Sequence, residues 1–202
     1  MEYLVLGFFT GLSLILAIGA QNIFVIEQGL KKQYVLLVCL ICSISDLILI
    51  FLGIFLFHYF VQYFNSTIEL ILNILLIIFL IHFIYSKIKS YNSKVEFNRE
   101  TQDVSKFDIF LKTLGFTYLN PHVYSDTVFF LGNFSKNFVF NDKILFGVSA
   151  SLASFLFFFL IGYLSKYLSH YAKSEKVWKI INLFIIIFMS MLTIFVILET
   201  IN

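Results

Sequence analysis

A cluster of polar residues interrupts an apolar segment near the middle of the chain. The cluster contains Asn120, Pro121, His122, Tyr124 and Asp126, within the run 110–131. Proline has no amide hydrogen and clashes with the carbonyl four residues earlier, so a helix through this run must open or kink near Asn120. An open backbone is costly in hydrocarbon, and a carboxylate costs about 2.5–3.5 kcal/mol on insertion scales. The cluster therefore predicts a protected path or site for a polar substrate or an ion.

A second acidic residue, Asp46, lies deep within the apolar run 34–57. It falls about twelve residues into the run, near the middle of a bilayer at a rise of about 1.5 Å per residue. Ser43 shares its helix face at a spacing of three residues. An ionisable group at this depth is a candidate substrate-binding residue. The alternative interpretation is a structural partner for a lysine or a helix end.

A third polar interruption occurs in the first apolar run, at Gly19, Ala20, Gln21 and Asn22. Glycine and alanine at this point predict a helix break, after which the helix resumes near Ile23. The amide side chains of Gln21 and Asn22 need hydrogen-bond partners within the membrane, since each carries both donors and acceptors. They are candidate substrate-binding residues, and the alternative is hydrogen bonding between helices.

The composition predicts the fold class that must position these side chains. Hydrophobic residues make up 60% of the chain and charged residues 13%, whereas soluble domains have about 45–50% and 25%. A membrane-spanning helix needs about 20 apolar residues. We therefore predict an all-α integral membrane protein, a single transporter domain over residues 1–202, with six transmembrane helices at about 3–26, 34–57, 68–85, 110–131, 144–163 and 180–198.

The basic residues predict the orientation in the membrane. Twelve of the 14 lysines and arginines fall in loops on one side of the six predicted spans, and the other two are Lys136 and Lys143. Because basic loops stay in the cytoplasm, both termini are predicted to lie outside. The net charge of +2 comes from these short loops, so no nucleic-acid partner is expected.

The two helix breaks indicate an internal duplication. Ala20 and Pro121 lie in the first and fourth predicted spans, so each half would contain three spans and the second copy would be inverted. Repeat 1 is predicted at about 1–86, a charged, solvated loop at 87–108, and repeat 2 at about 109–202. Interrupted helices at matching positions of inverted halves indicate the central site of a transporter.

Small residues predict where helices approach closely. Gly7 and Gly11 are four residues apart in the first span, and the segment 147–154 of the fifth span is rich in serine and alanine. Both patterns favour tight helix packing.

Other chemistries have little support in the sequence. Cys39 and Cys42 have the spacing of a redox pair, yet they lie within an apolar helix, where core packing is favoured over a membrane thiol carrier. The histidines, which are dispersed over the chain, do not form a metal site; they are His58, His82, His122 and His170. No catalytic residue, cofactor or enzyme activity is predicted.

The motifs together resemble the LysE-type family of basic amino-acid exporters, in its lysine and arginine branch. The resemblance rests on segments 19–25, 42–47, 119–127 and 181–182, in family order. It implies a bacterial inner-membrane exporter of lysine or arginine, driven by the proton gradient or the membrane potential. Alanine stands at position 20 where the family usually has proline, which predicts a shallower break. Asn73 and Ile74 stand where paired glycines are usual, which argues against a close approach of the third helix.

These residues lead to a hypothesis for transport. The substrate carboxylate is expected at the half-helix starts after Ala20 and Pro121, where free amides and the positive helix dipole favour an anion. Asp46 and Asp126 are expected to receive the cationic groups, and at least one of them to release a coupling proton as the substrate binds. His122 is a candidate to share that proton. Export of neutral amino acids or of another small cation is the alternative. The glycine and serine faces suggest a homodimer.

Overall fold

The computed structural model describes residues 1–16, 19–63, 66–92, 105–120, 123–171 and 175–201. Most of the described residues are helical and none lies in a β-strand, which confirms the all-α prediction for this part of the chain. The elements are α1 (Glu2–Ile15), α2 (Ala20–Lys31), α3 (Val35–Tyr63), α4 (Ser66–Asn92), α5 (Lys106–Tyr118), the π-helical segment η1 (Tyr124–Phe130), α7 (Leu131–Ser135), α8 (Phe140–Leu168) and α9 (Glu175–Ile201).

Four of the described helices, α3, α4, α8 and α9, are each long and apolar enough to cross a membrane. A fifth span is present if α1 and α2 are counted together, as a pair bent by 81° at their break. The prediction of a shallow break at Ala20 is therefore wrong. Gly19, with extended backbone at φ −113° and ψ −179°, precedes α2 and sets its new direction without proline.

The predicted fourth span is interrupted where the sequence indicates. The helix α5 ends at Tyr118, Leu119 and Asn120 are not helical, and the chain resumes as η1 and α7. Neither piece is long enough to cross a membrane alone, so it is not among the spans counted above. The opening near Asn120 is confirmed, whereas Pro121 and His122 lie outside the described residues.

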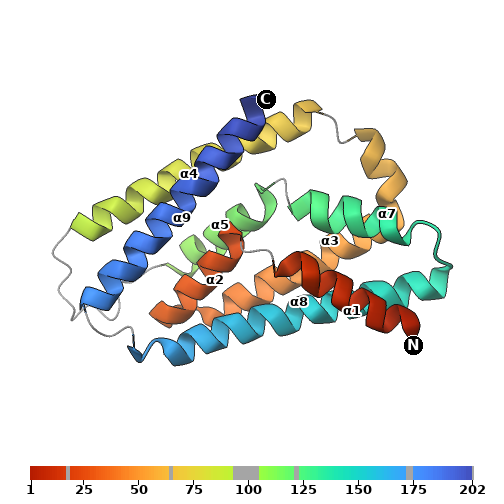
Figure 1. Ribbon diagram of the computed structural model, residues 1–202, viewed down its shortest axis with the longest axis horizontal. Coiled ribbons are helices and arrows are strands. Elements are labelled where there is room, and N and C mark those ends of the chain that lie inside the picture. Colours follow the sequence, from red (N-terminus) through yellow and green to blue (C-terminus); the bar gives the residue numbers. More distant parts are fainter. Residues whose placement is uncertain (17–18, 64–65, 93–104, 121–122, 172–174, 202) are drawn as a thin grey trace.

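The helices pack in a pattern that pairs the two halves of the chain (Figure 1). The broken pair α1 and α2 packs on α8, and the second broken set, α5, η1 and α7, packs on α3. The long helices α3 and α8 contact each other, and α4 packs along α9. Each interrupted span thus rests on a continuous helix of the other half.

Small residues allow these close contacts. A Cβ added at Gly11 would lie 2.9 Å from Ala150 Cα on α8, and Gly7 faces Phe146 and Ser149 of the same helix. Gly53 of α3 faces Val128 of η1. The packing predicted for Gly7 and Gly11 is confirmed.

A side chain at Gly53 is expected to destabilise the protein. Its Cβ would lie 2.6 Å from the Val128 carbonyl oxygen, which is backbone and cannot rotate away. We expect Gly53→Val to lower the free energy of unfolding by about 1–3 kcal/mol, the usual cost of overpacking. Thermal unfolding in detergent measures this change. Gly19→Ala is the stability control, since its added Cβ has nothing within 4 Å; equal melting temperatures for the two variants would contradict the expectation.

Candidate functional site

The two helix breaks open on one cavity of about 510 Å³. Five of the predicted substrate-binding residues line it, namely Gln21, Asn22, Asp46, Asn120 and Asp126, together with Gly19 at the first break. Val123 and Thr127 add to the second-break side. The remaining wall is apolar and comes from the three helices α1, α8 and α9, with Leu14, Ile15, Phe158, Phe188, Met191, Leu192 and Phe195. The cavity thus combines polar groups from the two breaks and α3 with apolar side chains of α1, α8 and α9.

Asp46 is the deepest charged group of this cavity. It is 3% exposed, and Ser154 of α8 donates a hydrogen bond of 2.7 Å to its Oδ2. The bond joins α3 to α8, at the middle of both helices. No lysine or arginine forms an ion pair with Asp46 within the described residues. The alternative interpretation of Asp46 as a lysine's structural partner therefore has no support from this part of the chain.

Asp126 reaches the same cavity from the second interrupted span. It lies in the π-helical segment η1, in which the turns are wider than in an α-helix. Such segments occur frequently at functional sites. The side chain of Thr127 donates to the carbonyl of Val123, one turn earlier. The widened turn brings Asp126 to the cavity wall while Thr127 satisfies part of the backbone.

Two side chains bridge the breaks by binding backbone carbonyls. Asn22 Nδ2 donates to the carbonyl of Ile15 at 3.0 Å, across the first break. The Tyr124 hydroxyl donates to the carbonyl of Tyr118 at 2.9 Å, across the second. Both bonds supply partners to carbonyls at a helix end, which a break leaves without intrahelical donors. Tyr124 holds the break and does not line the cavity.

Gln21 places a buried amide group at the cavity wall. Its side chain is 8% exposed, and its Nε2 has no hydrogen-bond partner within the described part of the chain. A buried donor without a partner costs about 1–3 kcal/mol. The start of α2 adds backbone amides, because Gly19 provides no side-chain cap. This end of the cavity therefore favours an acceptor such as a carboxylate, whereas Asp46 and Asp126 favour a cation.

The cysteines belong to the core and not to the cavity. Cys39 and Cys42 are free and fully buried. The Cys39 thiol donates to the carbonyl of Phe158 at 3.2 Å. Thiols enclosed in this way cannot meet a redox partner without opening the helix bundle.

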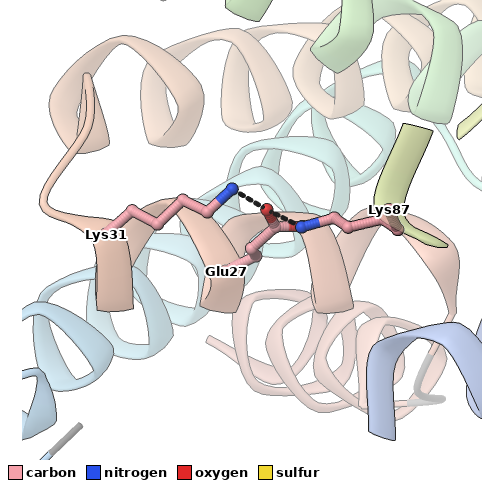
Figure 2. A network of polar contacts seen from close by, with 3 residues as sticks. All are labelled: Glu27, Lys31 and Lys87. Carbon is pink, nitrogen blue, oxygen red and sulfur yellow. Dashed lines mark hydrogen bonds and ion pairs between the residues drawn. The ribbon is translucent and has the colours of Figure 1, made fainter. Parts of the chain in front are cut away.

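A buried charge network was missed by the sequence analysis. Glu27 of α2 binds the ammonium groups of both Lys31 and Lys87 (Figure 2). The prediction that residues 87–108 form a solvated loop is wrong at both ends, because α4 continues to Asn92 and α5 begins at Lys106. Lys87 is only 7% exposed. Its spacing of four residues from Phe83 was the available signal, since it continues the buried face of α4.

Comparisons with known proteins give the family of the chain. A family model described as LysE type translocator matches residues 12–200. The arginine exporter protein ArgO of Pectobacterium carotovorum subsp. carotovorum (strain PC1) is 34% identical over 181 residues, 89% of this chain and 88% of that protein. The ArgO protein of Salmonella typhimurium (strain LT2) is 30% identical over 186 residues, 92% of this chain and 88% of that protein. No solved structure matches.

Proposed function

The chain belongs to the LysE-type translocator family, and on this premise we propose that it exports arginine, lysine or both across the inner membrane of a bacterium. It is a membrane transporter and not an enzyme. The relatives described above carry the name of arginine exporters. The single observation that carries the proposal is the meeting of Asp46 and Asp126, from separate spans, on one cavity.

The chemistry of the cavity supports a substrate with one carboxylate and two cationic groups. The amides at the start of α2 and the unpaired donor of Gln21 suit the carboxylate. Asp46 and Asp126 suit the α-ammonium and the cationic side chain. Asn22 and Asn120 contribute further polar contacts at the two breaks. The apolar wall of α8 and α9 suits the methylene groups that separate the charges of arginine or lysine.

His122 and Tyr124 have secondary roles in this proposal. Tyr124 keeps the second break open by binding the Tyr118 carbonyl, so it acts on the substrate through the shape of the site. His122 follows the break and is proposed to share the coupling proton with Asp126. Pro121 is proposed to set the position of the second break, and Gly19 precedes the start of α2 at the first.

The alternating arrangement of the helices supports six spans in two inverted repeats. The contact of α1 and α2 with α8 corresponds to that of α5, η1 and α7 with α3. In transporters built from inverted repeats the substrate site lies near the bilayer midplane, which supports the cavity as the proposed substrate site. We propose that the lysine-rich end is cytoplasmic, that both termini lie outside, and that the proton gradient or membrane potential drives export. A homodimer remains a prediction.

Growth on toxic analogues of the substrates tests the proposal. We expect cells that lack their own basic amino-acid exporters to tolerate toxic arginine and lysine analogues when they express this chain, because export keeps the internal concentration low. The minimum inhibitory concentration measures the protection, and its ratio between the two analogues gives the substrate preference. An empty vector and a toxic neutral analogue are the controls. Protection against the neutral analogue alone would indicate a neutral amino-acid exporter.

A further inference from the structure

The buried network of Glu27, Lys31 and Lys87 lies outside the cavity and has no role in the function proposed above. Glu27 is 1% exposed and Lys87 is 7% exposed, and Figure 2 shows the two lysines approaching the carboxylate from opposite sides. Both ammonium groups bind Oε1, whereas Oε2 has no hydrogen-bond partner within the described residues. Burying such charges costs more than burying apolar residues of the same size. The network therefore calls for a reason other than stability.

Glu27 of the charge network lies on α2, the helix whose first turn lines the cavity. Along α2, Gln21 lies on the cavity wall, Phe24 follows one turn later, and Glu27 lies a further turn on, about 9 Å from Gln21 along the axis. The network is thus at the lysine-rich end of the protein, which the proposed orientation places in the cytoplasm. A substrate that enters from the cytoplasm must pass this level before it reaches the cavity.

Three aromatic rings pack together next to the network. The ring of Phe116 lies 4.8 Å from that of Phe24 and 5.0 Å from that of Phe83. These rings come from α5, α2 and α4, so they join both interrupted spans to α4. The Lys87 ammonium lies 5.4 Å from the centre of the Phe83 ring. The ion pair of Glu27 and Lys87 therefore links α2 to α4, which are two of the three helices that the rings join.

The chemistry of Lys87 is that of the substrate's own side chain. A lysine ammonium or an arginine guanidinium carries the same charge and donates to the same carboxylate, and a guanidinium also has a second donor for Oε2. Lys31 keeps Glu27 partly neutralised when Lys87 leaves. Lys87 is five residues before the end of α4, and Lys89 beside it is already exposed. Its flexible stem can therefore carry the ammonium to water.

We propose that Glu27 is an entry site for the cationic side chain of the substrate, and that Lys87 occupies this site while the cytoplasmic end is closed. An arriving arginine or lysine replaces Lys87 at Glu27, which frees α4 from α2 and allows the aromatic rings to separate. The released substrate then moves on to Asp46 and Asp126. This inference rests on the proposed function, since it takes a basic amino acid as the substrate.

The test measures arginine export from cells loaded to graded internal arginine concentrations. It compares, between protein variants, the internal concentration that gives half-maximal export. Lys87→Gln removes the competitor and keeps Glu27 with Lys31, so we expect the half-saturating concentration to fall about threefold to tenfold. Glu27→Gln removes the site, and we expect this concentration to rise about tenfold. Lys89→Gln, on the exposed side of the same helix end, is the matched control and should behave as the unchanged protein.

A structural role for the pair makes a different prediction. The double variant Glu27→Lys with Lys87→Glu restores an ion pair between α2 and α4, and a purely structural pair would recover both the melting temperature in detergent and the half-saturating concentration. We expect recovery of the melting temperature alone, because the carboxylate then lies on α4 beside two lysines of α2. Full recovery of both, or an unchanged half-saturating concentration in Lys87→Gln, would overturn the inference. If the unchanged protein exports neither arginine nor lysine, the proposed function itself fails, and the variants play no part in that result.

Discussion

Asparagine at position 46 is expected to reduce arginine export about 30-fold or more. Removing one partner of a buried charge contact costs about 2–5 kcal/mol, and about 1.4 kcal/mol corresponds to tenfold. Asp46 is almost fully buried and accepts a hydrogen bond from Ser154. Water therefore cannot solvate a bound cation there in place of the lost carboxylate. Asparagine keeps the size of the side chain and the bond to Ser154, but it cannot neutralise a cation. Efflux from arginine-loaded cells, corrected for the amount of protein in the membrane, measures the effect.

Two control variants separate the charge of Asp46 from its contacts. Ser154→Ala removes the hydrogen bond and leaves the carboxylate, so we expect a loss of export much smaller than that of Asp46→Asn. Asp142→Asn removes an acid in the first turn of α8 that does not line the cavity, and export should be unaffected. Near-normal efflux in Asp46→Asn would remove the cation site from the proposed mechanism.

Asparagine at position 126 is expected to change the selectivity of export as well as its rate. Asp126 lines the cavity from η1 and is only partly buried, and its proposed contact with the cationic side chain of the substrate would be a charge-assisted hydrogen bond. Loss of a hydrogen bond to a charged group costs about 1.5–3 kcal/mol, or about tenfold to a hundredfold in affinity. The preference for arginine over citrulline, which has a similar shape without the side-chain charge, should fall by this factor.

Competition for arginine efflux by internal citrulline measures that preference directly. Asp108→Asn, which removes an exposed acid in the first turn of α5, is the control and should leave the preference unchanged. A variant at position 126 that loses export but retains full discrimination against citrulline would show that Asp126 acts on transport through a step other than recognition of the cation.

The sequence by itself determined the class of protein and the positions of both breaks. Hydropathy alone determines that the chain is helical and membrane-embedded, because backbone groups in hydrocarbon must bond within their own segment. Pro121 predicted the second break because proline lacks a backbone donor, and α5 ends at Tyr118, just before that position. Asp46, Asp126, Gln21, Asn22 and Asn120 could be selected because polar groups in apolar runs are costly. All five line the cavity.

Other features depended on contacts between residues distant in the sequence. The roles of Asn22 and Tyr124 as bridges to the Ile15 and Tyr118 carbonyls follow from the path of the chain at each break. The sequence predicted too small a bend at Ala20, because extended backbone at Gly19 turns the chain without proline. No local pattern in the sequence indicated that α9 lines the cavity, because its apolar residues resemble ordinary lipid-facing side chains.

Only the tertiary structure decided that Lys87 is buried. In the sequence it lies at the start of a charged stretch, where solvation is the usual outcome. In the folded protein α4 extends beyond the predicted span and brings Lys87 to Glu27, 60 residues away. Local patterns report the cost of placing one residue in lipid or water, and they contain no information on which distant residue offsets that cost. The cavity and the charge network both depend on such pairings, which exist only when the two halves of the chain pack together.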